Sequence, residues 1–232
     1  MENRRGRHTV GEEVIGIGAE AILIKAKLYS FTVIKKVRVP KSYRDPAFDE
    51  LIRYNRTVME TKIMIEAKAL GIPCPSVIEV DPHEGLIVMD YIDGPRLSDI
   101  LNKLRRSHLG RIFYTVGKYI GKLHENGIIH GDLTTSNMIL HNDTVYLIDF
   151  GLSYYSHQLE DKGVDMHLFL RALESTHYSL SKFLFDKVIK GYSEVIGENE
   201  ANKVIEKVKE IRIRGRYVKE RRKAKSNLRH KE

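Results

Sequence analysis

Apolar and polar residues alternate along roughly the first 90 positions of the chain, a pattern that predicts a sheet interrupted by one helix. Strands are expected over residues 12–27, folded at a turn near position 17, and over residues 31–35, 77–80 and 86–91. From Asp45-Pro46 to Leu70 the apolar residues instead recur three, four and seven positions apart. This spacing predicts a helix, and Gly71-Ile72-Pro73 is a typical helix end.

After Asp93-Gly94-Pro95 the spacing becomes mostly helical, so we place a lobe boundary there. Helices are expected over residues 98–106, 109–123 and 159–175, with two more within 179–211, and short strands over 128–130, 138–140 and 145–148. The pattern predicts an α+β fold with two lobes. Residues 1–92 form a β-rich lobe holding one helix, residues 93–211 form a mostly helical lobe, and residues 212–232 follow as a basic tail.

The composition is that of a soluble globular protein, with 42% hydrophobic and 30% charged residues among 232. No run of 18 apolar residues occurs, and no apolar stretch follows the first seven residues, so we expect neither a membrane span nor a secretory signal. The single cysteine, Cys74, excludes an intramolecular disulfide. Together these features predict a reducing, cytoplasmic setting.

The net charge of +8 comes entirely from the last 21 residues. Residues 212–232 contain ten Lys and Arg and two acids, whereas residues 1–211 contain 29 residues of each sign. Because such a segment is poor in apolar residues, we expect it to lack regular structure and to contact an acidic partner. The candidate contact residues are Arg212, Arg214, Arg216, Arg221, Arg222, Lys223 and Lys225.

The strongest local signal is His130-Gly131-Asp132-Leu133-Thr134-Thr135-Ser136-Asn137, with Asp149-Phe150-Gly151 starting twelve residues after Asn137. Oxygen-bearing side chains on two loops beside short strands are how phosphoryl-transfer enzymes hold Mg²⁺ on a nucleotide. The two segments resemble the catalytic loop and Asp-Phe-Gly motif of protein kinases. The resemblance implies that Asp132 is the catalytic base and that Asn137 and Asp149 bind the metal. The competing interpretation is that each aspartate only caps a turn.

A nucleotide also needs backbone donors and a cation for its phosphates. The candidate loop is Gly16-Ile17-Gly18-Ala19-Glu20-Ala21, in which Ala21 stands at the third glycine position of a kinase loop; a lone Gly-x-Gly is usually only a hairpin. On the next strand Lys35 matches the kinase lysine, because the alternation that buries Val33 directs Lys35 to the same face. Lys36 is the competitor.

The following helix offers two carboxylates as partners for Lys35, Glu60 and Glu66, of which we favour Glu60. Asp90 and Ile92, at the end of the last predicted strand of the first lobe, are the candidate nucleotide contacts near the hinge. His130 is expected to anchor the catalytic loop, and Asp165 to bond its backbone, although an ordinary first-turn acid is nearly as good an interpretation.

Two departures from typical kinases narrow the prediction. Gly131 stands where most protein kinases have an arginine that pairs with a phosphorylated activation segment. Only the thirteen residues 152–164 separate Asp-Phe-Gly from Asp165, with no Ala-Pro-Glu motif. We therefore expect neither regulation by loop phosphorylation nor a conventional peptide groove.

Several further segments make the resemblance specific. They are Gly18-Ala19-Glu20-Ala21, Val33-Ile34-Lys35, residues 40–46 (PKSYRDP), residues 56–60 (RTVME), residues 130–137, residues 160–165, residues 171–177 and Arg214-Gly215-Arg216. In this order they resemble the small atypical kinase subunit of the KEOPS complex, over nearly the whole chain. The resemblance implies ATP- and Mg²⁺-dependent ATPase or Ser/Thr kinase activity in threonylcarbamoyladenosine formation on tRNA. It also implies a threonylcarbamoyltransferase subunit and another small subunit as partners, and tRNA as the acidic molecule that the basic tail contacts.

Three other functions stay open on the sequence. Small-molecule phosphotransferases of the choline or aminoglycoside kinase type share the His-Gly-Asp loop, but they need a larger acceptor-binding insert than residues 152–211 offer. The second open function is that of a ribosome-associated kinase of the RIO type. The third, a catalytically silent RNA-binding scaffold, is disfavoured because every expected catalytic residue type is present.

Overall fold

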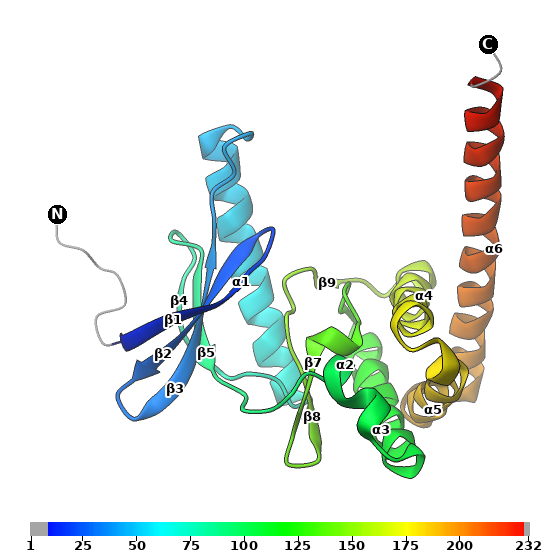
Figure 1. Cartoon of the computed structure of the whole chain (residues 1–232), viewed down its shortest axis with the longest axis horizontal. Coiled ribbons are helices and arrows are strands. Elements are labelled where there is room, and N and C mark those ends of the chain that lie inside the picture. Colours follow the sequence, from blue (N-terminus) through cyan, green and yellow to red (C-terminus); the bar gives the residue numbers. More distant parts are fainter. Residues whose placement is uncertain (1–8, 230–232) are drawn as a thin grey trace. The chain divides into compact units, whose positions relative to one another are not determined.

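The computed structural model describes the backbone of residues 9–229 and the side chains of residues 10–215 (Figure 1). The chain forms two compact units. The first contains the residues up to Leu97 together with Asn137–Tyr154, and the second contains Ser98–Ser136 together with the residues from Tyr155 on. The expected lobes differ from these units over residues 93–97 and 137–154, which the expectation assigned to the helical lobe.

The first unit is built on a five-stranded antiparallel sheet with the strand order β1-β2-β3-β5-β4. The strands are β1 (Thr9–Ile17), β2 (Ala21–Leu28), β3 (Phe31–Arg38), β4 (Val77–Asp81) and β5 (Leu86–Asp90). They confirm the strands expected from the alternating pattern. Gly18 N–H donates to the Ala21 carbonyl (2.9 Å), so the turn between β1 and β2 is a tight one.

Helix α1 (Pro46–Ala69) confirms the single helix expected in the first lobe. It begins where the sequence predicts, because the Asp45 carboxylate accepts a hydrogen bond from Phe48 N–H (3.1 Å) and Pro46 occupies the first turn. It ends before Gly71, whose φ of +73° suits a residue without a side chain. The buried face of α1 includes Glu60, Ile63 and Met64, and Glu60 is the functional member of that face.

A two-stranded hairpin, β7 (Met138–His141) and β8 (Thr144–Leu147), also belongs to the first unit. Two backbone bonds tie it in place. Leu140 N–H donates to the Pro95 carbonyl (3.1 Å) and Leu147 N–H donates to the Pro73 carbonyl (2.9 Å). The hairpin therefore carries the residues at its two ends, Asn137 and Asp149, into the unit that contains the sheet.

The second unit is mainly helical, as expected. Its elements are α2 (Leu97–Ile100), the 3-10 turn η1 (Leu101–Lys103), α3 (Arg106–Glu125), β6 (Ile128–Ile129), α4 (Leu159–Thr176), α5 (Tyr178–Ile196) and α6 (Glu198–Arg229), while η2 (Thr135–Asn137) and β9 (Tyr154–Tyr155) lie at the unit boundaries. The helix expected over residues 98–106 is instead the short α2 followed by η1, and Arg106 already begins α3.

Helices α3 and α5 approach each other closely. A Cβ atom added to Gly191 would lie 1.9 Å from the Tyr114 carbonyl oxygen, and one added to Gly117 would lie 2.0 Å from the Val188 carbonyl oxygen. Only glycine fits at these two positions, so the contact fixes how the two helices are spaced.

The basic segment is where the fold departs most from expectation. Helix α6 continues to Arg229, so the backbone of residues 212–229 is helical and not an irregular tail. The reason is local, because Lys, Arg, Glu and Ala are good helix formers and α6 has already been nucleated at Glu198. No helix in the described part of the chain is long and apolar enough to span a membrane.

Candidate active site

The register of β3 determines which lysine enters the candidate site. Ile34, Lys36 and Arg38 share one face of the strand, and Lys36 Nζ donates to Glu60 Oε1 on α1 (2.6 Å). Lys35 points to the opposite face, where its Nζ donates to Glu12 Oε1 on β1 (2.7 Å). The predicted pairing of Lys35 with Glu60 is therefore wrong, and Lys36 makes that contact.

The error has a physical cause. Burial of Val33 served as the marker of the pocket face, but Val33 packs with Ala26 and Val88 in an apolar cluster on the other side of the sheet. Both faces of β3 are covered, so a buried apolar residue does not identify the face that carries the site.

Glu60 is bound by two cations from the same strand. Its side chain is 1% exposed; Oε1 accepts from Lys36 Nζ, and Oε2 accepts from Arg38 Nη2 (2.5 Å). Neither predicted carboxylate contacts Lys35: Glu60 binds Lys36, and Glu66 lies 4.0 Å from Lys62 on its own helix. Sequence reasoning missed Arg38, although its offset of two residues from Lys36 places it on the same face of β3.

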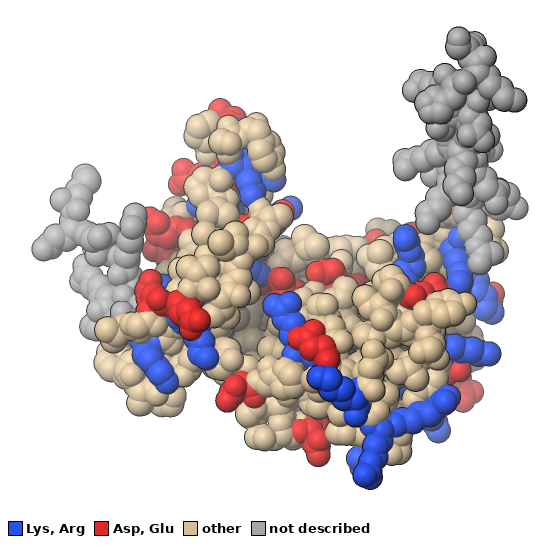
Figure 2. Space-filling model, viewed as in Figure 1, with Lys and Arg blue, Asp and Glu red and all other residues tan. Residues whose placement is uncertain are grey.

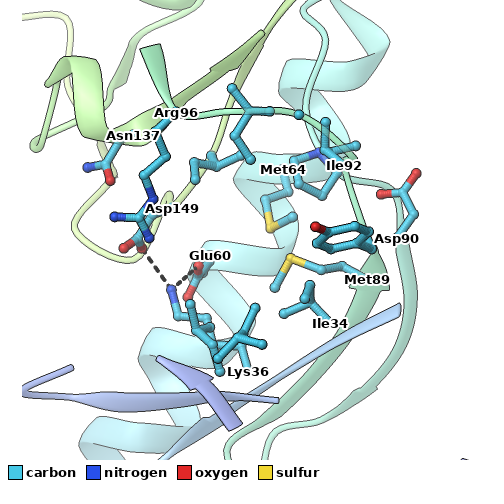
Figure 3. A pocket seen from close by; sticks show the side chains of 17 residues that line it. Ile34, Lys36, Glu60, Met64, Met89, Asp90, Ile92, Arg96, Asn137 and Asp149 are labelled. Atoms are coloured by element: carbon cyan, nitrogen blue, oxygen red, sulfur yellow. Dashed lines mark hydrogen bonds and ion pairs between the residues drawn. The ribbon is translucent and has the colours of Figure 1, made fainter. Parts of the chain in front are cut away.

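Lys36 connects Glu60 to Asp149. Its Nζ also donates to Asp149 Oδ1 (2.7 Å), so one ammonium group bridges two carboxylates (Figure 3). Burial disfavours the charged ammonium, but the carboxylates of Glu60 and Asp149 outweigh this effect and raise the pKa of Lys36 above its usual value. Lys36 is therefore a permanent cation at neutral pH.

Asn137 and Asp149 line the same pocket as Lys36. A backbone bond from Ile148 N–H to the Asn137 carbonyl (3.0 Å) ties the two ends of the β7–β8 hairpin together. Asp149 has a φ of +62°, which is costly for a residue other than glycine, and its Oδ1 accepts from Gly151 N–H (3.2 Å). One carboxylate and one amide oxygen, facing one pocket, form a donor set that fits Mg²⁺.

The pocket itself has a volume of about 260 Å³, slightly below the usual range of roughly 300–1,000 Å³ for small-ligand sites. One part is apolar, with Ile34, Met64 and Met89 among its walls, and the other part carries the charged groups (Figure 3). Asp90 and Ile92 both line it, although Asp90 uses its carboxylate to accept a hydrogen bond from Ser76 N–H. An apolar slot with charges at one end is suited to a flat ring bearing phosphates.

The expected phosphate loop does not line the pocket. None of its residues is part of the lining, which instead includes Ile15 and Leu23 from the flanking strands; the loop residues are Gly16, Gly18, Ala19, Glu20 and Ala21. Side chains behind the loop hold it. Lys41 donates to the Ala19 carbonyl, and Arg56 binds the Glu20 carboxylate. The Arg56 hydrogen bond lowers the pKa of Glu20 below its usual value.

Arg96 lines the pocket and was not anticipated from the sequence. It is exposed, and a backbone bridge to Ile139 of the β7–β8 hairpin fixes its position. Figure 3 shows its guanidinium on the side of the pocket that carries Asn137 and Asp149. No sequence signal marks it, because it follows Pro95 as an ordinary loop arginine.

In the second unit, Asp165 organises the catalytic loop. Its carboxylate accepts from the backbone N–H groups of His130 (3.1 Å) and Gly131 (2.9 Å) and contacts His124 Nε2 (3.2 Å). Burial raises its pKa, but the His124 hydrogen bond and the other partners outweigh this and hold the pKa below the usual value. The expected bond from Asp165 to the loop backbone is confirmed.

Asp132 follows directly in this loop, and its N–H donates to Nδ1 of the fully buried His130 (3.3 Å), which is consistent with the expected anchor role of His130. His124, whose Nδ1 also contacts the Tyr192 hydroxyl (2.9 Å), was missed. A histidine within an apolar helix face gives no sequence signal of such a contact.

Comparison with known proteins agrees with this geometry. Residues 20–162 match the family model described as RIO domain. The chain is 46% identical over 211 residues to the KEOPS complex subunit Bud32 of Pyrococcus abyssi, covering 88% of this chain and 96% of that protein. The chain belongs to the RIO-domain family of atypical kinases, in the group that contains Bud32.

Two further similarities show how much of the assignment each comparison supports. A probable bifunctional tRNA threonylcarbamoyladenosine biosynthesis protein of Methanocaldococcus jannaschii is 39% identical over 212 residues, which cover 91% of this chain but only 38% of that protein. A crystal structure of the Rio2 kinase of Chaetomium thermophilum, in an ADP/Mg²⁺–phosphoaspartate complex, superposes with a TM-score of 0.59 at 15% identity, covering 88% of this chain and 70% of that one. The second similarity shows a shared fold.

The RIO match ends at residue 162, before the basic segment. Within that segment, Arg212 pairs with Glu174 (2.9 Å) and Arg214 with Glu160 (2.5 Å), both on α4. The first two arginines of the expected contact set therefore bind this chain's own carboxylates. The side chains of the other members, Arg216, Arg221, Arg222, Lys223 and Lys225, lie outside the described residues.

Proposed function

We propose that this RIO-family kinase transfers a phosphoryl group from Mg²⁺-bound ATP to water or to a Ser/Thr hydroxyl, using the pocket of the first unit. The observation that carries the proposal is the bridge from Lys36 to both Glu60 and Asp149, in a pocket that also contains Asn137. A buried, fixed cation beside two magnesium-type ligands is what a nucleotide phosphate chain requires.

Each residue has a distinct role in this proposal. Lys36 binds the α- and β-phosphates, and Glu60 with Arg38 holds it in place. Asn137 and Asp149 hold Mg²⁺, which when bound neutralises the phosphate oxygens. Ile92 and the Asp90 backbone flank the slot for the base. Asp132 orients the attacking hydroxyl or water and accepts its proton.

The test is ATP turnover by Asp132→Ala and Asp149→Ala variants. We expect each to lose on the order of 10²–10⁴ in rate, because a positioned base or a metal ligand is removed. Asp99→Ala, at an exposed aspartate of α2, is the matched control and should retain full activity. Unchanged turnover in both site variants, with normal thermal unfolding, would end the assignment.

We further propose that this activity serves a KEOPS-type complex that forms threonylcarbamoyladenosine on tRNA in the cytoplasm. The similarity over nearly the full length of Bud32 supports this role, as do the names of the bifunctional relatives. The partners are then a threonylcarbamoyltransferase subunit, a further small KEOPS subunit, and tRNA. In the reconstituted complex, Asp149→Ala should abolish the modified nucleoside, whereas modification at the wild-type rate would contradict the role.

A further inference from the structure

The second unit has a basic groove between α3 and α5 to which neither the kinase motifs nor the comparisons assign a role. Its volume is about 600 Å³, and among the described residues its lining includes four cationic side chains and no carboxylate. The residues that matter are Arg106, Arg111 and Tyr114 from α3 and Phe183, Lys187 and Lys190 from α5. We call these six residues the α3–α5 groove.

The sequence around the groove is depleted of acids. Residues 100–124 contain six Lys and Arg and no Asp or Glu. The acids of α5, Asp186 and Glu194, do not line the groove, and Glu194 already pairs with Lys118 (2.9 Å). Figure 2 shows Lys and Arg side chains gathered over the region of α3, at the lower right of the view. The positive charge of the groove is therefore not neutralised locally, and a polyanion is the ligand that it fits.

Aromatic rings lie among these cations. The half-buried Phe183 ring has the Arg106 guanidinium 4.4 Å from its centroid and the Lys187 ammonium 5.7 Å from it, and Tyr114 is also half-buried. Grooves that combine cations along a backbone track with partly exposed aromatic faces are typical of sites for unpaired nucleotides, whose bases stack on the rings. An acidic peptide would use the cations but not the rings, so the composition favours RNA.

The groove is also preformed. Gly117 and Gly191 bring α3 and α5 into backbone contact, which fixes the spacing of the cations on the two helices. A rigid site loses less entropy when it binds.

We propose that the α3–α5 groove binds RNA, with Arg106, Arg111, Lys187 and Lys190 contacting phosphates and Phe183 stacking on an unpaired base. The proposal rests on the proposed function only for the choice of tRNA as the probe. This RNA contact is different from the one expected of the basic C-terminal segment.

The experiment measures binding of a fluorescently labelled tRNA transcript to the full chain over a range of salt concentrations. Two double variants, Arg106→Gln with Arg111→Gln and Lys187→Gln with Lys190→Gln, are compared with Lys27→Gln plus Lys62→Gln. The control removes two exposed lysines of the first unit and makes the same change in net charge. Thermal unfolding verifies that all variants are folded.

We expect each groove variant to bind more weakly and to lower the slope of log affinity against log salt by roughly 0.7–0.9 for each phosphate that its side chains no longer neutralise. Phe183→Leu should weaken binding about fivefold or more while leaving that slope unchanged, because stacking is not ionic. The lysine control should reproduce the wild-type slope.

Equal affinities and slopes in the groove and control variants would overturn the proposal. Binding of polyglutamate to the same variants is measured in parallel. If the groove variants lost polyglutamate binding but bound tRNA as the wild type does, the proposal would also be overturned, since the groove would then be a site for an acidic protein segment. ATP turnover is read separately in the Asp132 and Asp149 variants, so failure of the groove and failure of the kinase assignment give different results.

Discussion

The side chain of Glu60 is 1% exposed and contacts both Lys36 and Arg38. Removing one partner of a buried ion pair leaves an uncompensated charge, which typically costs about 3–5 kcal/mol. Because Arg38 also binds Glu60, this carboxylate would keep a cationic partner if Lys36 contacted a phosphate as proposed. Arg38 is thus a positioning residue for Lys36, acting through the carboxylate that they share.

The two neighbouring lysines of β3 provide a matched test at this scale. Lys36→Met should lower ATP turnover by on the order of 10²–10⁴, the range seen when a positioned catalytic group is removed. Lys35→Met should retain activity, because Lys35 faces Glu12 on the other side of the sheet. Steady-state ATP hydrolysis measures both. Loss of activity in Lys35→Met with normal activity in Lys36→Met would contradict the assignment.

The buried carboxylate of Asp165 predicts a pH dependence of stability. Its pKa is lower in the folded chain than the unfolded value of about 3.9, so its stabilising effect is complete above that value and is lost as pH falls through the folded pKa. The difference in unfolding free energy between wild type and Asp165→Asn should therefore shrink as pH falls below about 4. Urea unfolding measures this difference, and a value independent of pH would refute the prediction.

At the scale of elements, the contact between α3 and α5 depends on glycine. Gly191→Ala would place a methyl group 1.9 Å from the Tyr114 carbonyl oxygen if nothing moved, so the helices must separate. We expect destabilisation of about 1–3 kcal/mol, the usual cost of overpacking.

Gly215→Ala is the control of opposite sign. No atom lies within 4 Å of a Cβ added at this position of α6, so alanine should stabilise the helix by about 0.5–1 kcal/mol. Urea unfolding of the two variants should shift in opposite directions. A neutral Gly191→Ala would mean that α3 and α5 are not locked together.

The elements could largely be predicted from the sequence because their signals are local. Helix α1 has its cap at Asp45 and its stop at Gly71, both visible in the sequence. Which face of β3 lines the pocket could not be predicted in this way, since it depends on what covers each side of the sheet. The continuation of α6 beyond residue 211 is not predicted either, because a segment poor in apolar residues suggests irregular structure even when its residues are good helix formers.

The candidate site residues also divide into those that local sequence signals predict and those that only the folded structure places. Asn137, Asp149 and Asp165 stand in motifs whose spacing is readable in the sequence, whereas Lys36, Arg38 and Arg96 take up their places through strand register and a backbone bridge. These last interactions are tertiary, and a single sequence does not encode them in any short pattern.

At the scale of the whole molecule, the net charge is concentrated in the last residues of the chain. We expect deletion of residues 217–232 to weaken tRNA binding and to flatten its salt dependence, because Lys and Arg contacts with phosphates release counterions. ATP binding should persist, since the pocket lies in the first unit. Filter binding at several salt concentrations measures the effect, and an unchanged salt slope would exclude this segment as an RNA contact.

The central claim is that the first unit holds magnesium and a nucleoside triphosphate between Lys36, Asn137 and Asp149. Crystallography tests it most directly. Crystals grown with Mg²⁺ and a non-hydrolysable ATP analogue should show the base against Met64 and Met89, a phosphate beside Lys36 Nζ, and the metal on the Asn137 and Asp149 oxygens. Phosphates bound by Lys35, or an empty pocket at saturating nucleotide, would contradict the account.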